Sequence, residues 1–135
     1  MDRQLIAQKL EALRYCITRV KDKCPDDAAT LAADADAQDI VALNLTRAVQ
    51  QCVDIAAHII AERNIPAPET MGQGFERLAQ TGVITPELAT RMKHAVGFRN
   101  IAVHNYEAVN WRIVHAICKE RLIDFEEFAR SVARL

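Results

Sequence analysis

Apolar residues recur along the first part of the chain at the spacing of an amphipathic α-helix. The recurring positions are Ile6, Leu10, Leu13, Ile17 and Val20. Steps of three and four residues place these side chains on one face of a helix, with polar residues opposite. The pattern predicts a helix over about the first 23 residues, because Pro25 disfavours helix in the residue before it.

A second and longer helical pattern runs from about Asp36 to Arg63 and carries apolar residues on two adjoining stripes. The first stripe is Val41, Leu45, Ala48, Cys52, Ile55 and Ile59, and the second is Val49, Val53, Ala56 and Ile60. So wide an apolar surface is typical of a central helix in a bundle. A third stripe is polar and consists of Asn44, Arg47, Gln51, Asp54 and His58. It is either a solvent-exposed face or, at its N-terminal part, the border of a polar cleft.

Three more helical segments are expected after the linker at Pro66 and Pro68. Thr70 is a candidate N-cap for a short helix. Thr85 and Pro86 have the hydroxyl and the proline typical of another helix start. The inner face of a last stretch, expected from about residue 108 to 134, is Val114, Cys118, Leu122, Phe125, Ala129 and Val132. The chain therefore predicts an all-α fold, a single domain over residues 1–135 that forms an antiparallel bundle of four long helices plus a short helix.

Composition and cysteine spacing narrow the class of protein. The net charge of -1 argues against binding to nucleic acid through bulk positive charge. The four cysteines show no Cys-x-x-Cys pair and no zinc-like spacing with histidine, so we expect no metal and no cofactor, and a reduced cytoplasmic setting. No stretch approaches the roughly 18 apolar residues of a membrane span, so no membrane partner is expected.

Charge is distributed unevenly along the chain. The acidic residues between Cys24 and Thr46 are Asp26, Asp27, Asp34, Asp36 and Asp39, and no basic residue precedes Thr46 there. The basic residues and histidines between Leu88 and Tyr106 are Arg91, Lys93, His94, Arg99 and His104, with no acidic residue. These are either two solvated surfaces of opposite sign or an anion-binding patch that an acidic partner surface covers.

One short segment concentrates polar side chains that can do chemistry. Its residues are Arg99, Asn100, His104 and Tyr106. On an ideal helix Asn100 and His104 share a face, whereas Arg99 and His104 point about 140° away from each other. Either Arg99 and His104 have unrelated roles, or the helix bends or ends in this segment. Gly97 and Asn105 favour such a break.

An arginine and a histidine together suffice for metal-independent RNA cleavage. The guanidinium binds a phosphate bidentately, and the imidazole exchanges a proton near neutral pH. In this hypothesis the 2′-hydroxyl attacks the adjacent phosphorus, His104 acts as base or acid, and Arg99 holds the charged phosphorane. Asn100 positions an oxygen or the imidazole. Spacing alone also fits a capping or interface pair, so both interpretations stay open.

The same segment resembles a known family. Arg99 and His104 match the Arg-x4-His motif of HEPN domains, and Tyr106 extends it to the Arg-x4-His-x-Tyr form of HepT-like toxins. The string from Val96 to Glu107 is similar to that family throughout, and so is the helix around residues 44–50. The resemblance covers nearly the whole chain.

The resemblance implies an activity, partners and residue roles. HepT-like toxins are ribonucleases of toxin–antitoxin pairs, and they form two-fold homodimers that bring two copies of the motif to one cleft. Arg99 and His104 would be catalytic and Asn100 supporting. The antitoxin is a minimal nucleotidyltransferase that adenylylates the family tyrosine, which is Tyr106 here. An AMP group at that position would repel RNA and fill its place.

Three polar residues of the second helix, Asp39, Asn44 and Arg47, are expected as neighbours of this site without an assigned role. Two other functions remain open at this point. One is a non-catalytic helical binding module that docks a nucleotidyltransferase or a nucleotide. The other is a structural bundle in which the motif serves only as a dimer contact.

Overall fold

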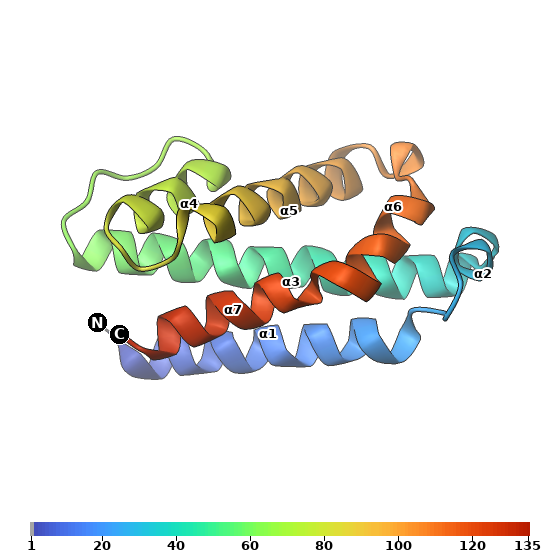
Figure 1. Cartoon of the computed structure of the whole chain (residues 1–135), viewed down its shortest axis with the longest axis horizontal. Helices are drawn as coiled ribbons and strands as arrows, with labels where there is room; N and C mark the ends of the chain where they lie inside the picture. Colours follow the sequence, from blue (N-terminus) through green and yellow to red (C-terminus); the bar gives the residue numbers. More distant parts are fainter. Residues whose placement is uncertain (1) are drawn as a thin grey trace.

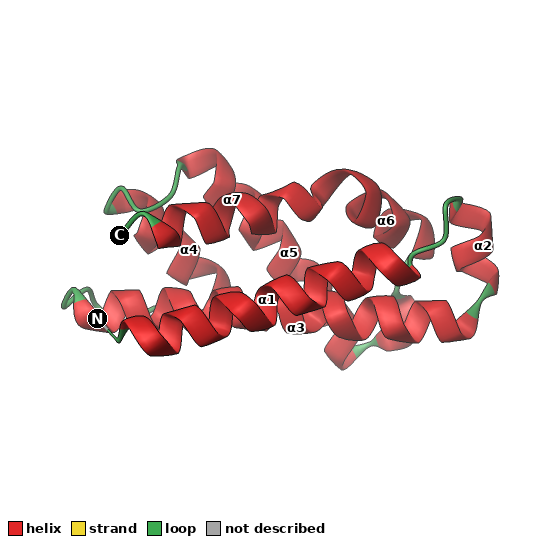
Figure 2. Ribbon diagram, turned by 90° about the horizontal axis from the view of Figure 1, so that it is seen from below, coloured by secondary structure: helices red, strands yellow, loops and turns green. Residues whose placement is uncertain are grey.

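The computed structural model describes residues 2–135, and its secondary structure is helical, with no strand in that range (Figure 1). The elements are α1 (Arg3–Lys23), α2 (Ala28–Ala33), α3 (Ala35–Glu62), α4 (Met71–Gln80), α5 (Pro86–His104), η1 (Tyr106–Ala108), α6 (Trp111–Ala116), the π-helix η2 (Ile117–Arg121) and α7 (Leu122–Ala133). The helices α1, α3, α5 and α7 alternate in direction along the bundle (Figures 1 and 2). The predicted antiparallel all-α bundle is thereby confirmed.

Helix α3 is the central element of the bundle. Its buried residues are Ala37, Val41, Ala42, Asn44, Leu45, Ala48, Val49, Cys52, Ile55, Ala56, Ile59 and Ile60. The helix α1 packs along one side of α3, and α4 and α5 pack along another. Both apolar stripes are therefore covered, which confirms the central position that the sequence predicted. The four cysteines are buried and free.

Side-chain oxygens accept hydrogen bonds from backbone N–H groups at the starts of α2, α3, α4 and α5. Thr70 caps α4 and Thr85 caps α5, both as predicted. Asp27 caps α2 and Asp34 caps α3. The segment between the first two long helices contains the short helix α2, which the sequence did not predict. Hydrogen bonds from the backbone N–H and the hydroxyl of Thr30 hold the pKa of Asp27 below its usual value.

Helix α5 is longer than the glycine in its sequence suggested. The helix continues through Gly97 and ends at His104, and Asn105 is its C-cap. A glycine inside a helix costs only about 0.5–1 kcal/mol relative to alanine. The burial of Val96 and the partial burial of Phe98 on either side of Gly97 outweigh that cost. The break expected in this segment therefore falls after His104.

The sequence predicted one continuous helix from about residue 108 to 134. The structure has instead a helix that begins at Trp111 and is interrupted by the π-helix η2. Its buried residues Val114, Cys118 and Leu122 follow at two successive steps of four. On a regular α-helix each such step rotates the side chain by about 40° away from the core. The wider turn of η2 accommodates the extra residue, so these side chains all remain on the buried face.

The start of α1 and the C-terminal Leu135 meet at one end of the bundle, where Arg3 Nη1 donates to the carbonyl oxygen of Leu135 at 3.3 Å. The helix α2 and the turn η1 lie at the opposite end (Figure 1). Within residues 2–135, no helix has the length and apolar character needed to cross a bilayer.

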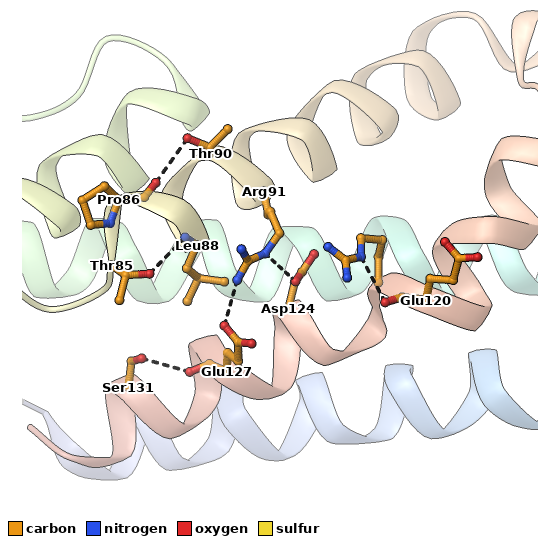
Figure 3. Close-up of polar contacts among 10 residues, drawn as sticks. Thr85, Pro86, Leu88, Thr90, Arg91, Glu120, Asp124, Glu127 and Ser131 are labelled. Carbon is orange, nitrogen blue, oxygen red and sulfur yellow. Dashed lines mark hydrogen bonds and ion pairs between the residues drawn. The ribbon is translucent and has the colours of Figure 1, made fainter.

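A network of charged side chains joins α5 to α7 (Figure 3). Arg91 Nε donates to Asp124 Oδ1 at 2.7 Å, and Arg91 Nη2 donates to Glu127 Oε2 at 2.9 Å. The side chain of Asp124 is only 8% exposed, whereas that of Glu127 is 36% exposed. Asp124 therefore depends on Arg91 for compensation of its buried charge, and Glu127 does not.

The two acids should differ in their contribution to stability. Replacing Arg91 by methionine leaves the buried carboxylate of Asp124 without its partner, and we expect a loss of about 2–4 kcal/mol in the free energy of unfolding. Glu127→Gln should cost about 0.2–1 kcal/mol, as exposed ion pairs do. Urea denaturation of the two variants measures the difference, and equal losses would contradict this account.

Candidate functional site

The candidate site lies where the end of α5 and the turn η1 meet the N-terminal half of α3. One stripe of α3 faces this region and consists of Asp39, Leu43, Thr46 and Gln50, at steps of four, three and four. Asp39, Leu43 and Thr46 line a shallow pocket together with Tyr106. Gln50 contacts Arg99 at the other end of the stripe. We call these four residues the α3 stripe.

Arg99 is half-buried against this stripe. Its Nη2 donates to Gln50 Oε1 at 3.4 Å, and its Nη1 donates to Asn100 Oδ1 at 3.2 Å. Its Nε is buried and has no hydrogen-bond partner within residues 2–135. A buried donor without a partner costs about 1–3 kcal/mol. The guanidinium of Arg99 therefore lies at the surface of the bundle with one donor still available.

His104 occupies the last position of α5 and is exposed. Within the described part of the chain its imidazole makes no hydrogen bond and no ion pair, so both ring nitrogens are free. The helix is regular between Arg99 and His104, so the two side chains leave it about 140° apart. The structure thus does not bring these two predicted residues together within one copy of the chain.

Tyr106 is held by contacts from two other helices. Its hydroxyl donates to Asp39 Oδ1 of α3 at 2.6 Å. Its ring packs edge-to-face on Trp111 of α6, with 5.6 Å between the ring centroids. Burial raises the pKa of Tyr106 well above its usual value, and the hydrogen bond and the negative charge of Asp39 raise it further. The phenol is therefore neutral and oriented, yet 38% of the residue is exposed.

The other two predicted neighbours on α3 lie elsewhere. Asn44 is buried, and its Nδ2 donates to the carbonyl oxygen of Ile40 on its own helix at 2.8 Å. Arg47 lies near Cys16 of α1, where burial raises the pKa of the thiol and the charge of Arg47 opposes that shift. Neither residue makes a polar contact with Arg99, His104 or Tyr106 within residues 2–135.

The polar stripe that includes these two residues is therefore not a simple solvent face. Asn44 is buried, and Asp54 forms an ion pair with Lys9 of α1 at 3.3 Å. His58 accepts from the backbone N–H of Asp2 at 3.4 Å. The stripe runs along the contact between α3 and α1, and Gln50 links it to the motif, because Gln50 Nε2 donates to Asp54 Oδ1 at 2.8 Å while Gln50 Oε1 accepts from Arg99.

Some basic residues of α5 form ion pairs with neighbouring helices, and others do not. Arg91 is paired with α7, and Lys93 is paired with Glu76 of α4. Arg99 and His104 have no acidic partner within residues 2–135. Among the arginines and lysine of α5, Arg99 is therefore the one without an acidic partner in the described part of the chain, and it lies near the C-terminal end of the helix.

Sequence reasoning did not single out Gln50 as a site residue. The signal was present, because Gln50 continues the spacing of Asp39, Leu43 and Thr46 on one face of the helix. Trp111 also lies beside the site, because its ring contacts that of Tyr106.

An apolar groove of about 680 Å³ lies beside the motif. Its wall includes Phe98, Ile101, Val109 and Ile113. Ile101 is 46% exposed and Ile113 is 60% exposed, so the groove presents apolar surface to solvent. Within the described residues no group of three or more His, Cys, Asp or Glu side chains gathers closely enough to hold a metal ion.

Comparison with known proteins places the chain in a family. Residues 13–132 match the HepT-like family, described as ribonuclease HepT-like. The chain is 37% identical over 124 residues to the mRNA nuclease HepT of Shewanella oneidensis, and the match covers 92% of each protein. The chain therefore belongs to the HepT-like family.

Solved structures agree with this membership. A tri-AMPylated HEPN toxin of Shewanella oneidensis, in complex with an MNT antitoxin, has a TM-score of 0.92 with this chain at 35% identity, with 100% of both chains covered. A toxin–antitoxin structure with AMP-PNP has a TM-score of 0.90, also at 35% identity, and covers 98% of this chain and 99% of its own. The cytosolic protein YutE of Bacillus subtilis, at 13% identity, shares the fold with a TM-score of 0.85 over 99% of this chain and 90% of its own.

The environment of Tyr106 predicts an unusual titration. Because its folded-state pKa lies above the value of about 10 for a free tyrosine, Tyr106 should remain neutral when an exposed tyrosine has ionised. Asp39→Asn should lower this pKa, since the charge is lost while burial persists. The ultraviolet absorbance of tyrosinate, taken as the difference between wild type and Tyr106→Phe, reports this residue in a chain with two tyrosines. Ionisation of Tyr106 near pH 10 in wild type and in Asp39→Asn alike would contradict the raised pKa that we attribute to burial and to Asp39.

Proposed function

We propose that this chain is the toxin of a toxin–antitoxin pair and that it acts as an endoribonuclease. The observation that carries the proposal is the Arg-x4-His-x-Tyr motif at the end of α5, with an exposed His104 that has no partner within residues 2–135. The relative named mRNA nuclease HepT supports an RNA substrate. The toxin structure in complex with an MNT antitoxin supports a nucleotidyltransferase as the partner.

The proposed reaction is cleavage of the RNA backbone by its own 2′-hydroxyl group. His104 accepts the proton of the 2′-hydroxyl as its oxygen attacks the adjacent phosphorus, or donates a proton to the departing 5′-oxygen. Arg99 contributes two donors in a planar fork to the phosphorane oxygens, where negative charge develops. Asn100 lies next to Arg99 Nη1 and orients the guanidinium. No metal ion is needed for these steps.

We further propose that the active form is a two-fold homodimer. Arg99 and His104 diverge on one helix, so the two side chains of a single copy do not converge on one phosphate. A second copy that packs its α5 against the first brings Arg99 of one copy close to His104 of the other. The exposed apolar residues Ile101, Val103 and Ile113 around the motif fit such a contact.

Control of the toxin is proposed to act at Tyr106. An AMP group on this hydroxyl stands two residues from His104 and adds a negatively charged phosphate and a base to the site. RNA is then excluded by both charge and volume. The tri-AMPylated state of the Shewanella oneidensis toxin supports this mode of neutralisation.

Removal of the imidazole of His104 tests whether RNA cleavage depends on this residue. We expect wild-type protein to cleave cellular RNA in EDTA and to leave 2′,3′-cyclic phosphate ends, because the 2′-oxygen is the nucleophile. His104→Ala should reduce the rate by about 100-fold or more. Analysis of the product ends measures both points, and His94→Ala on the same helix is the matched control. Loss of wild-type activity in EDTA would overturn the mechanism.

Absence of cleavage by folded, dimeric wild-type protein across a range of RNAs would favour the alternative function. In that case the chain is a helical binding module, and the motif docks a nucleotidyltransferase or holds a nucleotide. A monomeric or unfolded His104→Ala chain would instead favour the structural role of the motif as a dimer contact.

Mixing two inactive variants tests whether the site is shared between copies. Arg99→Ala and His104→Ala should each be inactive alone. After they are unfolded and refolded together, random pairing yields half mixed dimers, and each contains one intact pair of Arg99 and His104 from different copies. We therefore expect about a quarter of wild-type activity to return. No recovery, with mixed dimers demonstrated by mass spectrometry, would place both residues of each site in one copy.

A further inference from the structure

The contact between Tyr106 and Asp39 has a chemical consequence for the modification proposed above. Tyr106 lies on η1 and Asp39 on α3, 67 residues apart in sequence, and their 2.6 Å hydrogen bond ties the turn to the helix. The pair is accessible, because it lines a shallow pocket at the surface and both residues are exposed. The Tyr106–Asp39 pair therefore lies in a surface pocket and not in the core of the bundle.

Tyr106 is not a ready nucleophile in this environment. Burial and the neighbouring carboxylate keep its pKa far above neutral, so the phenolate is scarce. The proton must instead leave the hydroxyl while the oxygen attacks. A base already within hydrogen-bond distance of that proton meets the geometric requirement for general base catalysis.

We propose that Asp39 is the general base for adenylylation of Tyr106, so that the toxin supplies a catalytic residue for its own neutralisation. The inference rests on the proposed function, since it concerns the same modification. The Tyr106 Oη forms a bond to the α-phosphorus of a nucleoside triphosphate held by the antitoxin. The bond from that phosphorus to the bridging oxygen of the β-phosphate breaks, and pyrophosphate leaves with the electron pair. The hydroxyl proton passes to the Asp39 carboxylate.

The surroundings of the pair single out Asp39 for this role. The other residues that line the pocket, Ala42, Leu43, Thr46, Ala102 and Val103, carry no titratable group. The charged or titratable residues nearest in sequence on the surrounding elements are Asp36 on α3, His104 on α5, Glu107 on η1 and Arg112 on α6, and all are exposed. None of these four makes a hydrogen bond to Tyr106 within residues 2–135. The edge-to-face contact with Trp111 keeps the ring in place while the hydroxyl reacts.

Replacement of the carboxylate by an amide separates basicity from geometry. Asp39→Asn keeps an oxygen that accepts the hydrogen bond from Tyr106, but it removes the proton acceptor of the reaction. With the nucleotidyltransferase that suppresses toxicity and with radiolabelled ATP, we expect the turnover rate for modification to fall about 100-fold. The KM for the toxin should stay within about twofold, because docking of the antitoxin is unaffected. Asp39→Glu should recover part of the rate, since it restores a carboxylate.

The pH dependence of the adenylylation rate distinguishes a general base from a residue with only a structural role. In Asp39→Asn the reaction must use the phenolate, so its rate should rise about tenfold per pH unit as Tyr106 approaches ionisation. The rate of wild type should be nearly flat over the same range. Asp36→Asn, which removes an exposed acid three residues earlier on the same helix, is the matched control and should behave as wild type.

The outcomes separate this inference from the proposed function. If wild type is not labelled, or if Tyr106→Phe is labelled equally, modification at Tyr106 is wrong and the proposed control of the toxin fails. If wild type is labelled at Tyr106 and Asp39→Asn is labelled at the same rate, the general base is wrong and the control of the toxin stands. A rise in KM without a fall in turnover would make Asp39 a docking residue and would overturn the inference.

Discussion

The burial of α3 on several sides is the constraint on which the rest of the structure depends. Because α1, α4 and α5 cover most of its surface, only narrow stripes of side chains remain between them. One stripe lies along α1 and is occupied by ion pairs and capping contacts. The other, from Asp39 to Gln50, faces the end of α5. The division of one helix surface between its neighbours thus determines which side chains reach Arg99 and Tyr106.

The site combines a rigid scaffold with groups that are left free. Arg91 and Lys93 are neutralised by acids on neighbouring helices and hold α5 in place. Arg99 and His104, about two and three turns beyond Lys93, have no acidic partner within residues 2–135. Tyr106 follows after the helix has ended at His104, where the chain turns back toward α3. The middle of α5 therefore forms ion pairs that hold the helix in the bundle, and its C-terminal end carries the candidate site residues.

The sequence predicted the bundle because its apolar periodicity is strong in α1 and α3 and because Thr70 and Thr85 are recognisable caps. It did not predict α2, whose single buried residue, Leu31, leaves almost no periodic signal. In the site, the motif residues were identified from local spacing. Gln50 and the pairing of Asp39 with Tyr106 were not, since contacts across 49 and 67 residues depend on how α3 and α5 pack.

The π-helix between α6 and α7 holds one residue more than an uninterrupted α-helix would need. Deletion of one residue within Ile117–Arg121 would allow a continuous α-helix from Trp111 to Ala133 and would leave the downstream side chains close to their present orientation, because the wider turn has already absorbed the extra residue. A deletion within α7, ahead of Phe128, would instead rotate every later residue by about 100°. Phe128 would then turn out of the core. Members of this family should therefore tolerate a change in length of one residue in η2 far more readily than in α7.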